Sequence, residues 1–368
     1  MTDTHAPVRI GLAGYGFMGR QHAEFIERQA QATLVAIADP APVDAPVPVY
    51  VTIEAMIESQ QLDAVIIVNP NVLHVDSAIE CLEAGLTVLL EKPVATSYAE
   101  SLRLVDAVDR LQGRLLVGHH RRHHPSITSS AAALAAGAIG DLVGVSGVWS
   151  ARKEDVYFTE IPWHAEPGAG VMLINMVHDL DLLRHLCGEV VDVQAMTSTH
   201  ARGLVVEDTA SVNLRFASGV VGSFFASDAG VSPWGWDQAT EDTLEFPFVR
   251  DSMAYQLVGT RGALSVPDLA RYSYDPSVAP NWHSPLSRTY LEAPQTSSYD
   301  AQLKHFLAVV RGEAAPLVTA ADAAGTLALI EAAAQSAATG RTISMEEFRA
   351  QRAGNQRSDS SFTPVTFN

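Results

Sequence analysis

One short glycine-rich turn constrains the fold of this chain more than any other segment. Residues 14–19 read Gly-Tyr-Gly-Phe-Met-Gly and directly follow the apolar run 8–13. A strand that enters Gly-x-Gly-x-x-Gly and leaves as a helix is the dinucleotide-binding fingerprint: the glycines allow a tight turn, close approach of a pyrophosphate and packing of the helix. The phosphates would lie at the helix N-terminus. We therefore expect Gly14, Gly16, Phe17, Met18 and Gly19 to bind a dinucleotide.

Glycine-rich turns also occur without a ligand, so a second feature supports the prediction. The apolar segment 33–38 ends at Asp39, twenty residues past Gly19, where the carboxylate that holds the adenosine ribose is expected. Pro40 and Ala41 follow, so no basic side chain is present there to bind the 2′-phosphate of NADP. The Asp39 carboxylate itself would repel that phosphate. We predict NAD, with NADP less favoured. The alternative is that Asp39 merely starts the turn at Pro40.

Size, charge and cysteine content narrow the class of protein. A length of 368 residues predicts two domains, and a net charge of −18 argues against nucleic acid and anionic membranes as partners. The two cysteines, Cys81 and Cys187, form no disulfide framework and suit a reducing compartment. No basic-then-apolar leader opens the chain, and no apolar run approaches about 18 residues. We expect a cytoplasmic protein.

The order of patterns predicts two different sheets. Strand-like and helix-like segments alternate over residues 8–117, which predicts an α/β Rossmann domain with a doubly wound parallel sheet. Turn-separated strand patterns dominate residues 190–274, which predicts an α+β domain with a large, open, mostly antiparallel sheet. The predicted boundaries are 1–122 for the first domain, 123–345 for the second and 346–368 for a C-terminal tail.

Polar residues follow two of the predicted parallel strands. Strand 64–68 runs into Asn69, Pro70, Asn71 and His74, and strand 87–90 runs into Glu91-Lys92-Pro93. Ligands of open α/β sheets bind at the carboxyl ends of the strands, so these residues are expected beside the nicotinamide half of the cofactor. Pro93 would restrict the backbone after Lys92. The alternative is that Lys92 is an ordinary solvated loop lysine.

Histidines and arginines gather in the segment 118–125, Gly-His-His-Arg-Arg-His-His-Pro. Adjacent histidines point in different directions and no acid or thiol flanks them, so we predict no metal site. We expect a crossover between the domains that lines the cleft. The helical pattern 171–187 follows, with an apolar stripe that leaves Asn175 and His178 together off the stripe.

In this order the motifs resemble those of the Gfo/Idh/MocA oxidoreductases, the family of glucose-fructose oxidoreductase and inositol dehydrogenase. The resemblance runs from about Val8 to Arg341 and rests on five segments: 14–19, 69–74, 91–93, 168–178 and 320–341. It implies a substrate-binding C-terminal domain whose open sheet forms a homodimer or homotetramer. It also implies NAD(P)-dependent oxidation of a sugar, inositol or related polyol.

The same resemblance implies roles for individual residues. Lys92 would be the catalytic lysine, whose ammonium stabilises the developing alkoxide, and His178 the base that accepts the hydroxyl proton. Much of the family has an aspartate four residues before this histidine, where this chain has Ile174. The proton route is therefore open. Residues that could hold substrate hydroxyls, beside Lys92 and His178, are His120, Arg122, Trp163 and Asn175.

Two other functions fit the sequence. A dihydrodiol dehydrogenase, or a reductase that works toward the alcohol, could use Trp163, Trp234 and Trp236 against a planar ring as well as against a sugar face. A non-catalytic NAD-responsive binding protein is the alternative outside the enzymes. Such a protein would not need Lys92 together with His178.

Overall fold

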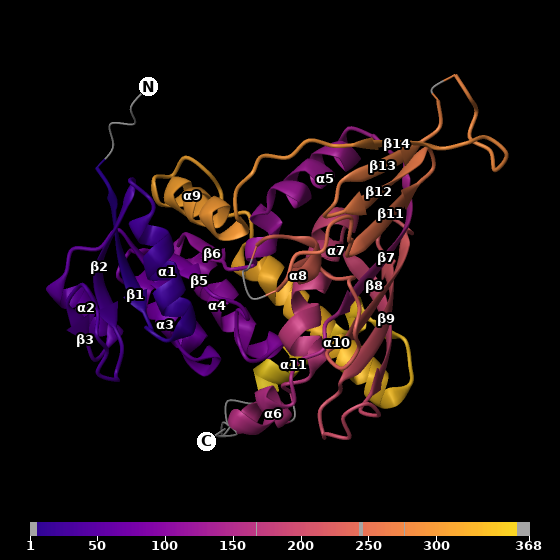
Figure 1. Ribbon diagram of the computed structural model, residues 1–368. Helices are drawn as coiled ribbons and strands as arrows, with labels where there is room; N and C mark the ends of the chain where they lie inside the picture. The colour runs from indigo at the N-terminus through magenta and orange to yellow at the C-terminus, as the bar shows by residue number, and fades with distance from the viewer. Residues whose placement is uncertain (1–5, 167, 243–245, 276, 359–368) are drawn as a thin grey trace.

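The computed structural model describes residues 6–358 apart from 167, 243–245 and 276 (Figure 1). It has two lobes, each built on its own sheet, as Figure 1 shows. In the first lobe six parallel strands lie in the order β3-β2-β1-β4-β5-β6. These strands are β1 Val8–Ala13, β2 Ala32–Ala38, β3 Val49–Tyr50, β4 Ala64–Ile67, β5 Thr87–Leu90 and β6 Leu115–Val117. This order confirms the predicted doubly wound sheet.

Helices cover both faces of this sheet, and two of them begin directly after a residue whose side chain caps the helix. They are α1 Phe17–Glu27, α2 Ile53–Ser59, α3 His74–Glu83 and α4 Tyr98–Leu111. Thr52 caps α2 through the N–H of Ala55, and Ser97 caps α4 through the N–H of Glu100. Strands β4 and β5 are buried along their whole length, because apolar β-branched and leucine side chains fill both faces.

The second lobe confirms the open, mostly antiparallel sheet. Nine strands lie in the order β14-β13-β12-β11-β7-β10-β9-β8-β15, with β7 and β10 parallel to each other. The bounds are β7 Leu142–Ser150, β8 Val190–Ser198, β9 Thr209–Phe216, β10 Val221–Ser227, β11 Tyr255–Gly259, β12 Gly262–Val266, β13 Ala270–Ser273, β14 Ser287–Tyr290 and β15 Ile343–Ser344. The sequence had not predicted β13, β14 or β15.

Helices cover one face of the second sheet and leave the other open, as Figure 1 shows. The covering helices are α5 Pro125–Ala135, α7 Val177–Cys187 and α10 Ala320–Thr339. A π-helical turn, Met172–Met176, leads into α7. The short helices α6 Val156–Glu160 and α8 Trp236–Ala239 lie in the long connections after β7 and β10.

The C-terminal third departs from the predicted boundaries. Helix α9, Ser298–Val310, packs against the first lobe, and its Leu303, Phe306 and Leu307 join the core around sheet β1–β6. Helix α11, Met345–Ser358, lies where the tail was expected to begin, and Phe348 is 2% exposed beside Tyr98. This helix was missed because only its first turn carries large apolar residues. Residues 359–368 lie outside the described part of the chain.

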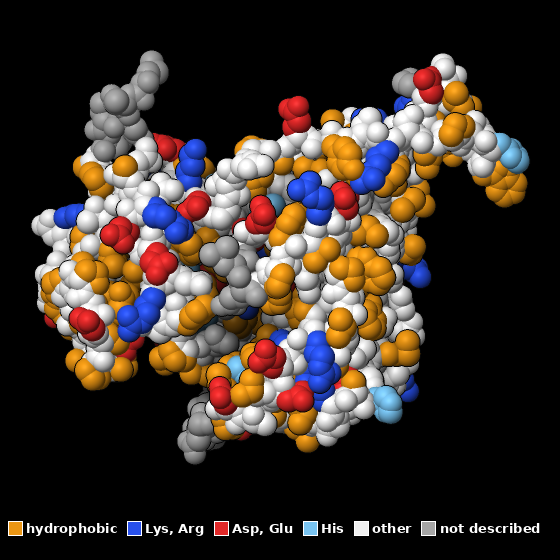
Figure 2. Space-filling model, viewed as in Figure 1, with side chains coloured by type: hydrophobic (Ala, Val, Ile, Leu, Met, Phe, Trp, Pro, Cys, Tyr) orange, Lys and Arg blue, Asp and Glu red, His pale blue; other side chains and the backbone are white. Residues whose placement is uncertain are grey.

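None of the described helices is both long enough and apolar enough to cross a membrane. Acidic and basic side chains are interspersed over the face of the molecule drawn in Figure 2.

Candidate active site

The glycine-rich turn has the geometry that a dinucleotide needs. Gly14 has a φ of +101°, and a Cβ there would lie 2.9 Å from the backbone of Val68 and Asn69. A Cβ on Gly19 would collide with the carbonyl oxygen of Gly14, so this glycine lets α1 pack against the turn. A Cβ on Gly16 would meet nothing within 4 Å. The open space at Gly16 is where a pyrophosphate could approach the backbone.

The N-terminus of α1 lies free of side-chain caps. Gly16 is the N-cap and makes no side-chain hydrogen bond, and no acidic residue stands in the first turn. Phe17 is 65% exposed, and Met18 follows it in the same turn. The backbone N–H groups and positive dipole of this helix end could therefore hold phosphate oxygens.

Asp39 lies at the carboxyl end of β2 and supports the turn directly. Its Oδ2 accepts the N–H of Tyr15 (2.8 Å), and its Oδ1 accepts the N–H of Ala41 (2.9 Å). Each carboxylate oxygen keeps a second lone pair for a ribose hydroxyl. The two roles considered for Asp39, turn residue and ribose ligand, are thus compatible in one geometry.

The segment after β4 is tied to the segment after β5. His74 is buried, with Nδ1 2.7 Å from the carbonyl oxygen of Pro93 and Nε2 3.0 Å from that of Asn69. Burial lowers the pKa of His74. Asn69 donates from Nδ2 to Ser77 (2.8 Å), and its buried Oδ1 has no partner among the described residues. His74 therefore positions the two loops, while Pro70 and Asn71 lie exposed at their edge.

Glu91 and Lys92 are held together at the end of β5. The Glu91 carboxylate receives a hydrogen bond from His22 Nε2 (2.9 Å) of α1 and from the N–H of Lys92 (3.1 Å). A Cβ on Gly118 would lie 3.0 Å from this carboxylate, so the glycine makes room for it. Burial acts to raise the pKa of Glu91, but His22 and Lys92 together outweigh burial and hold it below its usual value.

Lys92 lies at the centre of a group of buried cations and histidines. Burial lowers its pKa, Glu91 partly opposes this, and Arg121 lowers it further. Lys92 also lowers the pKa of His178, which places the two side chains within electrostatic reach. The structure thus brings together the two residues predicted to carry the chemistry, one from each lobe.

The surroundings of His178 favour the neutral form of its imidazole. It is 8% exposed, its ring makes edge contacts with His120 (5.4 Å) and His119 (6.4 Å), and its buried Nδ1 has no partner within the described chain. Burial, followed by the charges of Lys92 and Arg121, holds its pKa well below the usual range. A neutral imidazole can accept a proton at its unprotonated nitrogen.

Arg121, which was not predicted as a site residue, joins the crossover segment to the second lobe at this site. It donates to Asp179 (3.4 Å) beside His178 and to Asp237 (3.2 Å) of α8. Trp149 donates to the same Asp237 (2.7 Å). Burial raises the pKa of Asp179 to about 7, although Arg121 opposes this. The network fixes the helix that carries His178.

Two of the predicted substrate ligands from segment 118–125 are already engaged. Arg122 donates from Nε and Nη2 to Asp181 (both 2.7 Å) and from Nη1 to Asp322, so it joins α7 to α10. The His120 ring stacks on Tyr299 of α9 at 4.2 Å and 12°. His120 still faces His178, whereas the geometry of Arg122 is that of a structural ion pair.

The remaining histidines of the segment diverge. His119 Nδ1 lies 3.6 Å from Asp181, His123 lies 5.1 Å from His305 between ring centres, and His124 Nδ1 lies 2.7 Å from Ser126 Oγ. Across residues 6–358, leaving aside the undescribed positions, no three His, Cys, Asp or Glu side chains come together in a way that could hold a metal ion.

Asn175 and Trp163 occupy different surroundings. Asn175 Oδ1 accepts a hydrogen bond from Lys153 Nζ (2.9 Å), a lysine the sequence analysis did not single out. Trp163 lies in the turn Pro162–Ala165, is 52% exposed and makes an edge contact with His164, which stacks on Tyr157. Of the two, Asn175 is the one that lies next to the helix of His178, in the π-helical turn that leads into α7.

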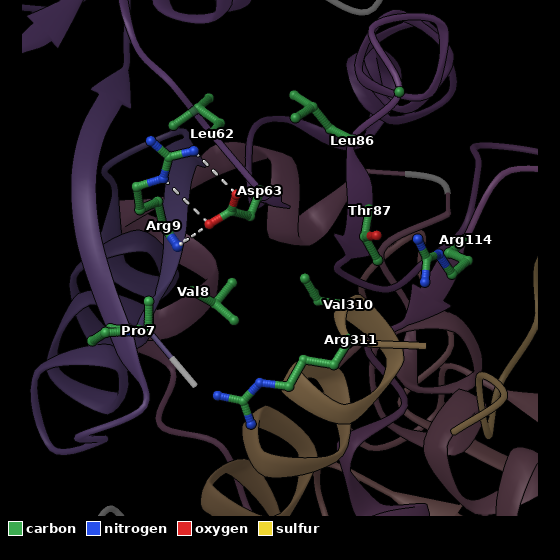
Figure 3. Close-up of a pocket in the computed structure, with 12 residues that line it drawn as sticks. Pro7, Val8, Arg9, Leu62, Asp63, Leu86, Thr87, Arg114, Val310 and Arg311 are labelled. Carbon is green, nitrogen blue, oxygen red and sulfur yellow. Dashed lines mark hydrogen bonds and ion pairs between the residues drawn. The ribbon is translucent and has the colours of Figure 1, made fainter. Parts of the chain in front are cut away.

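A pocket of about 760 Å³ lies at the opposite edge of the first sheet (Figure 3). It is lined by the amino-terminal ends of the strands, and the Arg9–Asp63 ion pair (3.1 Å) lies in its wall. Ligands of doubly wound sheets bind at the carboxyl edge, where Gly16, Asp39 and Lys92 lie. The candidate site is therefore the carboxyl edge rather than this pocket.

The buried histidines predict acid lability. Burial holds the pKa of His123 at about 3 and those of His120 and His178 well below the usual value. The unfolded chain protonates near pH 6.5, so stability is lost as pH falls below 6.5; from 6.5 to 5.5 each histidine costs about 1 kcal/mol, or about 3 kcal/mol together. Urea unfolding at both values measures this. His123→Asn should reduce the loss by about 1 kcal/mol, whereas the exposed His200→Asn should leave it unchanged; equal losses in the two variants would contradict this.

Comparison with known proteins gives two family matches. Residues 8–119 match the model described as the oxidoreductase family with an NAD-binding Rossmann fold, and residues 129–265 match the GFO/IDH/MocA C-terminal domain. Together these segments cover about two thirds of the chain.

Similar proteins span nearly the whole chain. Inositol 2-dehydrogenase of Rhizobium meliloti (strain 1021) is 27% identical over 349 residues, covering 92% of this chain and 99% of that protein. D-apiose dehydrogenase of Paraburkholderia graminis is 28% identical over 366 residues, covering 95% and 93%. A solved oxidoreductase from Agrobacterium radiobacter, in complex with NAD+, L-tartaric acid and magnesium, superposes with a TM-score of 0.77 at 20% identity, covering 93% of this chain and 99% of that one.

Proposed function

The chain belongs to the Gfo/Idh/MocA oxidoreductases, and from that premise we propose that it is an NAD-dependent dehydrogenase. It oxidises a secondary hydroxyl of a sugar, inositol or related polyol to a ketone, or catalyses the reverse reduction. The observation that supports the proposal is that the charge of Lys92 acts on His178, a buried imidazole that also faces His120 (5.4 Å between ring centres). A protein that only binds NAD has no use for that pair.

The residues at the carboxyl edge of the first sheet fit NAD. Gly16 and the start of α1 would hold the pyrophosphate, and Asp39 would hold the adenosine ribose. Asn69 and Asn71 would lie toward the nicotinamide, with His74 and Glu91 positioning their loops. When bound, NAD supplies the hydride acceptor at nicotinamide C4.

The protein's own side chains stabilise the developing negative charge and accept the proton. The ammonium of Lys92 stabilises the negative charge that develops on the substrate oxygen as the hydride leaves. His178 accepts the hydroxyl proton, because its lowered pKa keeps it neutral at physiological pH. Asn175, which lies three residues before His178, would contact a substrate hydroxyl in place of the absent carboxylate at position 174.

A screen for NADH formation tests the proposal. NAD is mixed with the protein and with inositols, aldoses, sugar acids, deoxy sugars or cis-diols in turn, and NADH absorbance is recorded. We expect at least one sugar or polyol to be oxidised. Oxidation of aromatic cis-diols alone would support a dihydrodiol dehydrogenase. Tight NAD binding without oxidation of any compound would support a non-catalytic binding protein.

The charge of Asp39 predicts the choice between NAD and NADP. A carboxylate at the ribose repels a 2′-phosphate, so kcat/KM should favour NAD by about tenfold to a hundredfold. Asp39→Asn keeps an acceptor for the N–H of Tyr15 and should bring the ratio close to one. Asp44→Asn, in the same exposed loop, should leave the ratio unchanged. Equal use of both cofactors by the unaltered protein would remove this role from Asp39.

We further propose that the open face of the second sheet joins two copies of the chain, as a dimer or tetramer. It carries exposed apolar side chains, among them Met196, Val221, Phe225 and Val258. Phe225 lies opposite Val148 on β7 and Ser211 on β9, near the middle of the sheet. Phe225→Glu should shift the protein toward monomers in sedimentation, whereas Asn281→Glu on the β13–β14 connection should not. A monomeric unaltered protein would contradict this.

Two free, buried cysteines suit a cytoplasmic setting.

A further inference from the structure

Lysine is rare in this chain, and its placement is selective. Only three of the 24 basic residues are lysines: Lys92, Lys153 and Lys304. Lys304 is exposed on α9, whereas the other two lie toward one site. Arginine is thus the ordinary surface cation of this protein. A second lysine beside Lys92 calls for a specific explanation.

The strand ends of the second sheet hold Lys153 in place. Lys153 follows β7, and its N–H donates to the carbonyl oxygen of Asp228 (2.8 Å), which follows the parallel strand β10. Its Nζ donates to Asn175 Oδ1 (2.9 Å) and lies 4.7 Å above the Tyr157 ring. Its side chain is 16% exposed. The ammonium therefore lies beside the residue one helical turn before His178.

Lys153 shares its buried carboxylate partner with a second cation. Asp228 Oδ2 lies 3.6 Å from Lys153 Nζ, but Oδ1 of the same carboxylate accepts a hydrogen bond from Arg202 Nε (3.0 Å). Arg202 also pairs with Asp155 (2.9 Å), but Asp155 is 78% exposed and its charge is screened by solvent, so Asp228 is the buried carboxylate that these two cations share. Burial lowers the pKa of Lys153, Asp228 opposes this, and Arg202 and Lys92 lower it further. At position 174, where a carboxylate would add negative charge, the chain has isoleucine.

Resting on the proposed function, we infer that the substrate carries a carboxylate, as an aldonic or uronic acid does, and that Lys153 binds this carboxylate. A charge-assisted hydrogen bond from a largely buried ammonium to a carboxylate favours the acid over the matching neutral polyol. In the reaction the carbinol C–H bond breaks and its hydride passes to NAD. The O–H proton passes to His178, and a C=O bond forms. The carboxylate keeps its bonds and its charge.

Matched substrate pairs test the inference. D-Gluconate and D-glucitol differ at one carbon, as do D-glucuronate and D-glucose. The unaltered enzyme should favour the acids by about tenfold to a hundredfold in kcat/KM. Lys153→Met should remove that preference mainly through KM, and Lys153→Arg should keep part of it. Lys304→Met, the third lysine, should change nothing. Equal use of acids and neutral partners, or an unchanged preference in Lys153→Met, would overturn the inference.

A binding measurement separates this inference from the proposed function. Calorimetry on the NADH complex should detect the two acids but not their neutral partners, and Lys153→Met should lose that binding. Acid binding without any oxidation would support the role of Lys153 and reject the dehydrogenase. Oxidation of neutral polyols without acid preference would do the reverse. Two results would overturn the inference that Lys153 binds a substrate carboxylate. One is Lys153-dependent binding of glucose 6-phosphate without binding of the acids, and the other is no binding of any of these compounds.

Discussion

Replacing Lys92 by methionine should lower kcat by about two to four orders of magnitude while the affinity for NADH changes by no more than a few-fold. Methionine has nearly the same length but no charge, so it removes stabilisation of the developing alkoxide and leaves packing in place. Lys92 is half-buried beside the buried Glu91 and Arg121, where a fixed charge acts more strongly than in bulk water. Steady-state kinetics and fluorescence titration with NADH measure the two effects.

Lys304→Met controls for the loss of a lysine as such, because that side chain is exposed on α9. If Lys92→Met turned over nearly as fast as the unaltered enzyme, Lys92 would have no catalytic role and would be an ordinary loop lysine. A large loss of NADH affinity without loss of kcat would assign it to cofactor binding instead.

His178→Ala should lower kcat/KM by about 10² to 10⁴, the usual contribution of one general base. The unaltered enzyme should also show a pH dependence that the variant lacks. Oxidation needs the neutral imidazole, so the rate should fall as pH drops through an apparent pKa at or below about 6.5. Because burial and Lys92 hold the pKa of His178 well below its usual value, the rate should be level by neutrality.

At alkaline pH a second decline should follow, since burial also lowers the pKa of Lys92 and its charge is then lost. Asn175→Ala should cost less than His178→Ala, because Asn175 bonds to Lys153 and positions the site without taking the proton. An acid limb that persists unchanged in His178→Ala would mean that the proton leaves through another group. Lys92 or a chain of water molecules would be the next candidate.

Much of the fold was predictable because its signals are local. Strands β4 and β5 are short apolar runs with helices on both faces, and the turn at Gly14 needs glycine for reasons that spacing alone reveals. Helix α11 and strand β14 were not predicted because they lack such local signals. Their sequences are polar, and their positions depend on contacts with distant elements.

The site was less predictable because it depends on pairs that are far apart in sequence. Arg122 had the character of a substrate ligand until its ion pairs with Asp181 and Asp322 were known. Lys153 gave no signal, because only the fold brings it to Asn175. Lys92 and His178 were reached through the family resemblance, and their separation of 86 positions hides their proximity in the sequence. Polar partners at long range are what a single sequence does not specify.

Deuterium transfer is the most direct test of the claim that Lys92 and His178 serve hydride transfer to NAD. The alcohol identified by the NADH screen is prepared with deuterium on its carbinol carbon, and the NADH produced is analysed by mass spectrometry and NMR. We predict that one deuterium appears at nicotinamide C4, and that the rate of its appearance falls by about two to four orders of magnitude in Lys92→Met. NADH without deuterium, or equal transfer by Lys92→Met, would contradict that claim.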